Sequence, residues 1–368
     1  MRSVYWNHPR KSTLDGKKHI CRFRKQEVLI SRVYLLTGAA GFLGGEICRQ
    51  LIDRHCTVRA FVLPNDPAAK YLPAGVEICE GDLCSASDVE RFFTVPAGVN
   101  TVVIHCASIV ALGTEPSELV MNVNVGGTKH IIAQCLSHPE CEKLVYVGST
   151  GAIPELPKGQ AMKEITRFDA NKVVSAYGQS KAVATQAVLD AVREKGLNAC
   201  VVQPSGILGP GDVAMSQTTT GILQQMQGEV PVAVNGTFNL CDVRDLAAGT
   251  LAAVDRGKTG ECYILANEVV SYPEFARLVA EEGHCKQPVF YLPLWLAHGV
   301  AWLLKQLSRA TGKAPALTEY MIYNLSRNNA FDSSKARQEL GYTSRPFRET
   351  IRDEVQWLRE GGYLKESE

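Results

Sequence analysis

Three glycines spaced three residues apart constrain the fold of this chain more than any other feature. Val33–Thr37 is a short run of β-forming residues that leads directly into Gly38, Gly41 and Gly44. Gly38 allows a sharp turn, Gly41 a close approach of a phosphate, and Gly44 close packing of the helix that follows. A strand, a glycine turn and a helix in this order predict that a dinucleotide pyrophosphate binds at the helix N-terminus. The alternative is an ordinary connection between a strand and a helix.

Length and composition narrow the class of protein. A chain of 368 residues can bury one large α/β core or two smaller ones, and 45% hydrophobic with 21% charged residues is typical of a soluble globular protein. The net charge of +1 gives no reason to expect a nucleic-acid partner. Twelve scattered cysteines form no C-x-x-C pair and no cluster with zinc spacing. We therefore expect reduced thiols in a cytoplasmic protein, without a metal site.

Residues 1–30 differ from the rest of the chain. Basic residues outnumber acidic ones in this segment, and it has no sustained apolar period. It also lacks the apolar run and cleavage site of a signal sequence. We expect an unstructured basic extension, and the alternative is an arm that contacts nucleic acid or lipid.

From Val33 onward, strands and helices alternate. Strands are expected at 33–37, 57–63, 76–80, 101–106, 143–147 and 199–203, and helices at 44–54, 85–93, 116–136 and 176–195. This alternation predicts an α/β fold of the Rossmann type, with a doubly wound parallel sheet whose strand ends bind ligands. Residues 31–204 would form the dinucleotide-binding domain. Residues 205–368 would form a smaller, interleaved substrate-binding region, with segments 238–266 and 331–364 packing back on the first domain.

The stretch 288–304 is unusually apolar and contains Trp295 and Trp302. Pro293 and His298 interrupt it, and it is too short to span a membrane. It therefore predicts a buried helix, or a helix that lies in a lipid interface with its tryptophans at the headgroups.

Tyr177 and Lys181 carry the strongest chemical signal. Residues four apart share one helix face, and an ammonium beside a phenol lowers the pKa of the phenol towards working pH. Tyr177 is therefore a candidate acid and base for a hydroxyl or carbonyl group. The alternative is an exposed helical pair, which the preceding glycine turn disfavours.

Two hydroxyl residues follow the strand at 143–147. Ser149 and Thr150 could point into the cleft and polarise the same carbonyl as Tyr177. The alternative is a simple turn stabilised by a side-chain hydroxyl. Spacing does not choose between the two residues.

Several ordered motifs resemble the extended short-chain dehydrogenases/reductases. The resemblance runs from about Arg32 to Leu364, and the motifs are T-G-A-A-G-F-L-G at 37–44, G-D-L at 81–83, H-C-A-S at 105–108, N-V-G-G-T at 124–128, the pair Tyr177/Lys181, and P-S-G-I-L-G-P-G-D at 204–212. It implies that Lys181 contacts the nicotinamide ribose and tunes Tyr177, and it favours Ser149 over Thr150 as the catalytic hydroxyl. The cofactor-binding residues that it implies are Gly38, Ala40, Gly41, Phe42, Leu43, Gly44, Asp82, Leu83, Ala107, Ser108, Tyr177, Lys181 and Pro204. His105 and Cys106 have an alternative as packed strand residues.

The branch of the family sets the expected substrate. Residues 202–205 read Val-Gln-Pro-Ser, which departs from the R-x-F-N pattern of members that act on nucleotide sugars. The motif is more similar to the dihydroflavonol-reductase-like and 3β-hydroxysteroid-dehydrogenase-like branches. The resemblance implies an NAD(P)-dependent oxidoreductase, acting on a secondary alcohol or ketone of a hydrophobic ring substrate. The alternatives are a nucleotide-sugar epimerase or dehydratase with tightly bound NAD, and a non-catalytic cofactor sensor. A homodimer and peripheral membrane contact through 288–304 are further expectations.

Cofactor choice depends on the end of the second strand. Val62 takes the place where NAD users often carry Asp, and Leu63 the place where NADP users often carry Arg. Arg59 lies inside the strand. Because no cation is clearly placed to pair with a 2′-phosphate, we expect NAD(H), with NADP(H) as the alternative.

Overall fold

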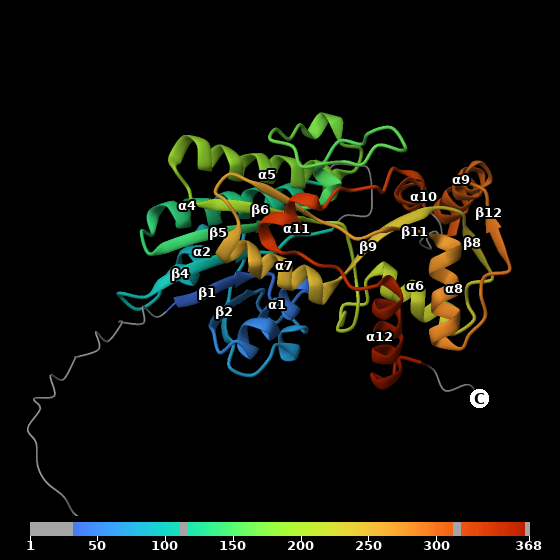
Figure 1. Ribbon diagram of the computed structural model, residues 1–368, viewed down its shortest axis with the longest axis horizontal. Coiled ribbons are helices and arrows are strands. Elements are labelled where there is room, and N and C mark those ends of the chain that lie inside the picture. Colours follow the sequence, from blue (N-terminus) through green and yellow to red (C-terminus); the bar gives the residue numbers. More distant parts are fainter. Residues whose placement is uncertain (1–31, 111–116, 312–317, 365–368) are drawn as a thin grey trace, which may run out of the picture. The chain divides into compact units, whose positions relative to one another are not determined.

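The structure is a computed structural model that describes residues 32–110, 117–311 and 318–364. Figure 1 shows the arrangement of their helices and strands. The expected basic extension at 1–30 lies outside the described residues. The described residues belong to one compact unit.

A seven-stranded parallel sheet forms the centre of this unit. Its strand order is β10-β6-β5-β4-β1-β2-β3, and every neighbouring pair is parallel. The strands are β1 (Arg32–Thr37), β2 (Thr57–Val62), β3 (Glu77–Glu80), β4 (Asn100–His105), β5 (Cys141–Val147), β6 (Ala199–Pro204) and β10 (Cys262–Leu265). The chain runs outward from β1 in one direction and from β4 in the other, so their carboxyl ends form a topological switch point. The predicted Rossmann-type doubly wound sheet is confirmed.

Helices cover both faces of the sheet (Figure 1). One face packs against α1 (Phe42–Asp53), α7 (Val243–Arg256) and α11 (Ser334–Leu340). The other packs against α2 (Ala86–Phe93), α4 (Thr128–Ser137) and α5 (Ala176–Lys195). Successive strand residues alternate between the two cores, which explains why the strands have nearly continuous apolar sequences.

The long helix expected over 116–136 is present but is not uniform. It consists of α3 (Glu118–Met121), the π-helical segment η2 (Asn122–Gly127) and then α4. Pro116, the expected first residue, lies outside the described residues. A widened turn of this kind changes the direction of the side chains that it carries.

Smaller elements after β6 form a second region at the carboxyl side of the sheet. Its two sheets have the orders β11-β9-β7 and β12-β8. The elements are β7 (Gly206–Leu208), α6 (Gln217–Met226), β8 (Val232–Val234), β9 (Thr237–Asp242), β11 (Val269–Ser271), α8 (Tyr272–Gly283), β12 (Phe290–Leu292), α9 (Leu294–Thr311), α10 (Glu319–Ser326) and α12 (Phe347–Glu360). Within 331–364, α11 packs on α7, whereas α12 packs on α6 and α8 through a stripe of buried apolar residues.

The apolar stretch 288–304 is not a buried helix. It contains β12 and most of α9, and the side chains of Trp295 and Trp302 are 76% and 61% exposed. Ala297 and Ala301 on the other side of α9 are buried against α10. The two alanines pack α9 against the protein while the large apolar side chains stay exposed to solvent. The interpretation of this stretch as a core helix is therefore wrong. Among the described helices, none is both long and apolar enough to cross a membrane.

A buried carboxyl group lies between α12 and the turn before α6. Glu354 is fully buried, and the neighbouring Asp212 and Asp242 are buried with it. Asp212 accepts hydrogen bonds from the Thr219 hydroxyl and the Ser216 backbone, and Asp242 forms an ion pair with Arg244 at 2.7 Å. Burial raises the pKa of Glu354 to about 8. The negative charges of Asp212 and Asp242 also raise this pKa, whereas the Thr219 hydroxyl and the Arg244 guanidinium lower it.

We predict that Glu354→Gln stabilises the protein in a pH-dependent way. A glutamate in the unfolded chain ionises near pH ~4.3, so the wild-type chain must take up a proton to fold between that pH and about 8. The free-energy cost of this protonation grows as the pH rises through this window and is constant above it. Urea unfolding should show that the variant gains on the order of 2–4 kcal/mol at pH 7.5 and little at pH 4.5.

Glu360→Gln, at an exposed position of the same helix, is the matched control and should show no such pH dependence. A Glu354→Gln variant that is less stable than the wild type at pH 7.5 would contradict the prediction.

Candidate cofactor and catalytic site

Glycine backbone contacts shape the turn after β1. Gly38 has a φ of +68°, and a Cβ at this position would lie 2.6 Å from the backbone nitrogen of Ala107. A Cβ on Gly44 would lie 2.1 Å from the carbonyl oxygen of Gly38. The first turn of α1 is therefore packed directly on the turn, at a distance that no other residue permits.

The N-terminus of α1 is open for an anion. Its cap residue, Gly41, has no side chain to accept hydrogen bonds from the first backbone N–H groups, and the first turn carries no acidic residue. These groups and the helix dipole together favour a phosphate. A Cβ on Gly41 would lie 3.2 Å from the Gly38 oxygen and would fill part of this cradle.

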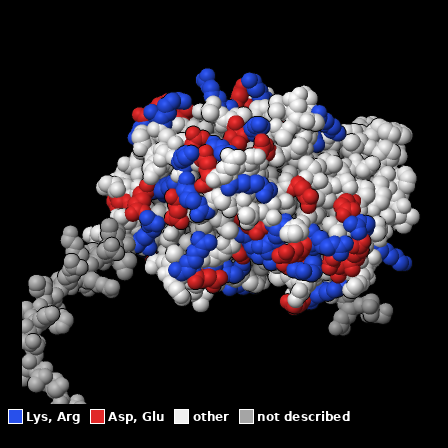
Figure 2. All heavy atoms as spheres, viewed as in Figure 1, with Lys and Arg blue, Asp and Glu red and all other residues white. Residues whose placement is uncertain are grey.

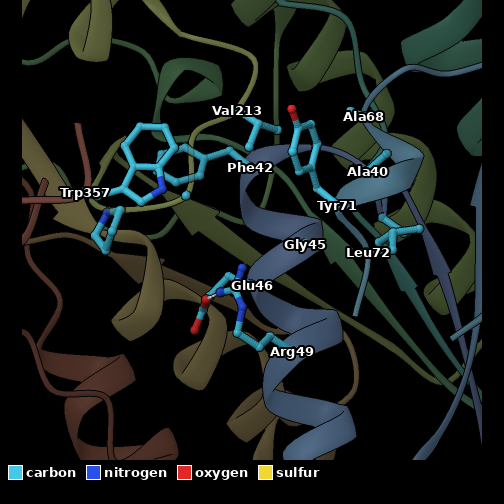
Figure 3. A pocket seen from close by; sticks show the side chains of 14 residues that line it. Ala40, Phe42, Gly45, Glu46, Arg49, Ala68, Tyr71, Leu72, Val213 and Trp357 are labelled. Carbon is cyan, nitrogen blue, oxygen red and sulfur yellow. Dashed lines mark ion pairs between the residues drawn. The ribbon is translucent and has the colours of Figure 1, made fainter. Parts of the chain in front are cut away.

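A pocket of about 210 Å³ adjoins the glycine turn. Figure 3 shows it at the first turns of α1, with the rings of Phe42, Tyr71 and Trp357 at its rim. Glu46 and Arg49 form an ion pair along the same side of α1. Pro210 and Gly211, in the turn after β7, also line the pocket, so residues of the second region lie beside the glycine turn.

Asp82 and Leu83 follow β3, on the side where the adenine is expected. The Asp82 carboxylate accepts a hydrogen bond from the backbone N–H of Cys84 at 2.9 Å. Leu83 is buried against Gly127, where a Cβ would lie 2.9 Å from the Cβ of Leu83. The turn therefore packs against η2, while the Asp82 side chain is exposed to solvent.

Arg59 does not behave as a phosphate ligand. Its guanidinium donates to the carbonyl oxygens of Phe92 and Thr94 and forms an ion pair with Glu77 at 2.9 Å. These contacts engage it with α2 and β3. At the end of β2, Val62 is buried and Leu63 is 57% exposed. The sequence could not decide where Arg59 points, because strand alternation gives a face and not a partner.

His105 joins the glycine turn to the central helix. Its Nδ1 lies 2.6 Å from the Thr37 hydroxyl, and its Nε2 lies 3.0 Å from the hydroxyl of Thr128. Burial lowers the pKa of His105 to about 3, and the nearby Lys181 acts in the same direction. A neutral imidazole can donate at one nitrogen and accept at the other, so it suits a bridge between two hydroxyls.

Asn124 ties the segment after β4 to α5. Its Oδ1 accepts from the Ile109 backbone N–H at 2.7 Å, and its Nδ2 donates to the Ile109 carbonyl and to the Ser180 hydroxyl at 3.0 and 2.9 Å. Ser180 in turn donates to the Tyr177 carbonyl at 2.7 Å. The sequence motif at 124–128 contained this residue, but its role depends on the widened turn of η2 and was missed.

Lys181 is buried on α5. Its exposed fraction is 1%, its Nζ donates to the Val147 carbonyl at 2.8 Å, and it lies 5.0 Å from the centre of the Tyr146 ring. Burial lowers the pKa of Lys181 to about 8. Tyr177 lies one turn earlier on the same helix and is half-buried.

A second glycine contact places the start of α5 on the loop after β5. Ser175 caps the helix by accepting from the Gly178 N–H at 3.0 Å. A Cβ on Gly178 would lie 2.4 Å from the carbonyl oxygen of Gly151. The helix turn that contains Tyr177 is therefore in backbone contact with the loop that begins at Ser149. Sequence reasoning did not single out Gly178, although it stands between Tyr177 and Lys181.

The two candidate hydroxyls have different surroundings. The Ser149 hydroxyl accepts a hydrogen bond from the Gly151 N–H at 3.0 Å, keeps its own proton as a donor, and is half-buried. Thr150 is buried and donates to the Pro204 carbonyl at 3.2 Å. Ser149 can therefore stabilise the turn as an acceptor and still donate a hydrogen bond to a ligand in the cleft. The Thr150 hydroxyl already donates its hydrogen to the Pro204 carbonyl.

The predicted site residues follow the carboxyl ends of adjacent strands. Gly38 follows β1, Ala107 and Ser108 follow β4, Ser149 follows β5, and Pro204 ends β6. These strands are consecutive in the sheet order. The glycine turn and the Tyr177 segment thus share one edge of the sheet, and Leu43 and Gly44 pack beneath it in the core.

Comparisons with known proteins agree with this geometry. The profile of the NAD dependent epimerase/dehydratase family matches residues 34–266. A protein of Synechocystis sp. whose name suggests a dihydroflavonol 4-reductase is 30% identical and covers 92% of this chain and 98% of its own length. The sterol-4-alpha-carboxylate 3-dehydrogenase of Schizosaccharomyces pombe is 29% identical, over 84% of this chain and 92% of that protein.

Solved structures share the fold. The crystal structure of gox2253 has a TM-score of 0.78 and 30% identity, and covers 91% of this chain and all of that one (100%). The UDP-glucose 4-epimerase of Thermus thermophilus in complex with NAD has a TM-score of 0.70 at 21% identity, over 89% and 99% of the two chains, and shows the fold alone. The chain belongs to the NAD dependent epimerase/dehydratase family, whose description names the cofactor that the sequence predicts.

Proposed function

We propose that this protein transfers a hydride between NAD and a secondary alcohol or ketone on a hydrophobic ring substrate. The observation that carries the proposal is the buried Lys181, one helical turn from Tyr177 and packed beside the loop of Ser149. A buried ammonium next to a phenol is an arrangement suited to proton transfer, and it lies at the same sheet edge as the glycine turn.

The residues of the chain fit NAD. The uncapped N–H groups at the start of α1 suit the pyrophosphate, and the glycine cradle leaves room for it. Asp82 and Leu83 would contact the adenine, and Ala107, Ser108 and Pro204 the nicotinamide half. NAD, when bound, accepts or supplies the hydride at its nicotinamide ring.

The catalytic roles follow from position and charge. Tyr177 would donate or accept the proton of the substrate oxygen, and Ser149 would donate a hydrogen bond to the same oxygen. Because the pKa of Lys181 is about 8, most of its amine is charged at pH 7. That charge favours the deprotonated form of Tyr177 and lies where it can reach the nicotinamide ribose.

The hydrophobic substrate is supported by the relatives and by residues 202–205. Two relatives carry names of sterol and flavonol chemistry, and the nucleotide-sugar pattern is absent at 202–205. In this proposal 31–204 binds NAD and 205–368 covers the substrate. The rival function is an epimerase or dehydratase, in which the hydride returns to the same molecule. The two are separated by whether turnover causes a net change of the cofactor: an oxidoreductase forms NADH from NAD with an alcohol such as a sterol, or consumes NADH with an aromatic ketone, whereas an epimerase or dehydratase acting on a nucleotide sugar does neither.

We further propose that α9 contacts a lipid surface. The exposed side chains of Phe290, Trp295, Trp302, Leu303 and Leu307 extend from β12 along α9, and each is at least 50% exposed. Figure 2 shows few charged side chains at the end of the molecule where Figure 1 places β12 and α9. The first turn of α9 carries no acidic residue, so no negative charge there would repel anionic headgroups.

Tyr177→Phe should lower kcat by about 10²–10⁴-fold while NAD binds with nearly wild-type affinity, because the ring remains and only the hydroxyl that transfers the proton is lost. Steady-state kinetics and calorimetric titration with NAD measure the two effects. Retention of more than about a tenth of the wild-type kcat would remove Tyr177 from the mechanism.

Gly44→Ala should destabilise the fold by about 1–3 kcal/mol and weaken NAD binding by at least about tenfold, because the new methyl group overlaps the Gly38 carbonyl. The matched control is the adjacent Gly45→Ala, whose Cβ would lie an ordinary 3.6 Å from its nearest neighbour. Thermal unfolding and NAD titration of both variants check the prediction. Equal behaviour of the two would show that the contact at Gly44 does not matter.

The double variant Trp295→Ser/Trp302→Ser should bind vesicles that contain anionic lipid at least about tenfold more weakly than the wild type, since burial of each large apolar side chain is worth ~1.5–3 kcal/mol. Ile78→Ser, at a 49% exposed position of edge strand β3, is the control and should bind normally. Co-sedimentation with vesicles measures both. No vesicle binding by the wild-type protein would refute the lipid contact.

A further inference from the structure

The Lys181 ammonium is buried without a carboxylate. Among the residues that the structure describes, no Asp or Glu forms an ion pair with it, and its Nζ donates a hydrogen bond to the Val147 carbonyl. The titratable groups around it are His105 at the end of β4, Cys106 directly after it, Tyr146 on β5 and Tyr177 on α5. A charge that is removed from water requires other compensation.

His105 and Cys106 do not compensate for the buried charge of Lys181. His105 is neutral because its pKa is about 3, and burial raises the pKa of the Cys106 thiol to about 12, so this group is neutral as well. Burial also raises the pKa of Tyr146 well above its ordinary value, which leaves a neutral phenol. What remains beside the ammonium is one carbonyl dipole and the face of an aromatic ring.

We propose that Tyr146 is a positioning residue whose aromatic ring keeps Lys181 charged for its action on Tyr177. The Lys181 Nζ lies 5.0 Å from the ring centre, within the range of a cation–π interaction, which is strongest for a desolvated cation. This inference rests on the proposed function, and it gives a role to a residue to which the sequence motifs assigned none.

Packing fixes the ring in place. Tyr146 is 1% exposed and lies on the sheet face that α4 and α5 cover, and its ring packs against the His105 ring with centres 5.6 Å apart. His105 in turn is hydrogen-bonded on both sides. The ring therefore cannot turn away from Lys181 without breaking this packing, so its stabilising effect is built into the fold.

Loss of the ring should lower the pKa of Lys181. Without the ring, the charged amine of Lys181 is still desolvated but loses the cation–π attraction. Lys181 therefore releases its proton at lower pH. At pH 7.5 more of the enzyme would then carry a neutral Lys181, which would neither favour ionised Tyr177 nor bind the ribose as strongly. The ring thus sets the upper limit of the working pH range.

The test compares Tyr146→Leu with Tyr146→Phe. Tyr146→Phe keeps the ring and should retain the wild-type pH profile. In Tyr146→Leu, the pH midpoint at which NAD affinity falls should move down by about one pH unit, and kcat at pH 7.5 should drop by about threefold, as the charged fraction of Lys181 does. At pH 6, where Lys181 is charged in all forms, the dissociation constants for NAD should agree.

Either of two results would overturn the proposal. The first is a midpoint in Tyr146→Leu that equals the wild-type value, and the second is a Tyr146→Phe variant as strongly shifted as Tyr146→Leu. Tyr146→Met, which has an unbranched side chain, is measured in the same way if Tyr146→Leu fails to fold. The pH dependence of NAD binding needs no substrate, so it tests Tyr146 even if the proposed hydride transfer proves wrong.

Discussion

Close contact between backbone segments at glycines is the constraint on which the site depends. Gly44 lets α1 pack on the Gly38 carbonyl, and Gly178 lets α5 pack on the Gly151 carbonyl. The first contact opens a helix N-terminus towards a pyrophosphate, and the second places the Tyr177 turn against the Ser149 loop. Because both segments follow parallel strands of one sheet, the two contacts act at the same edge. A side chain at either position would separate the groups that chemistry requires to be close.

Neutral hydrogen bonds connect these two contacts. Thr37, beside the first glycine turn, bonds to His105, which bonds to Thr128 on the central helix. Asn124, one turn before Thr128, bonds to Ser180 on α5. Every member of this chain is buried, and none needs a net charge at neutral pH, so the link costs little desolvation of ions. These hydrogen bonds hold the glycine turn after β1 and the Tyr177 turn of α5 in fixed positions relative to each other. They add no further charge beside Lys181.

Local sequence patterns were sufficient for the sheet strands β1 to β6 and for the helix Ala176–Lys195, because apolar periodicity and the Ser175 cap depend on neighbouring residues, whereas the strand β10 was not predicted. The glycine turn was predictable for the same reason. The widened turn at Asn122–Gly127 was not, because it exists through contacts of Asn124 with Ile109 and Ser180 that lie far apart in sequence. The exposure of Trp295 could not be predicted from a local pattern either, since the side of α9 that is buried is the one with the small residues Ala297 and Ala301.

The absence of a carboxylate beside Lys181 in the described structure has a chemical logic. A carboxylate would stabilise the ammonium more strongly than a ring does, and would hold its pKa high. The same negative charge would oppose the ionised phenol of Tyr177, one helical turn away, and would occupy donors that the ribose needs. An aromatic face attracts the cation without adding a net charge. In this proposal Tyr146 stabilises the charged Lys181 while the field of the ammonium remains directed at Tyr177, and the ring opposes the burial that lowers the pKa of Lys181 to about 8.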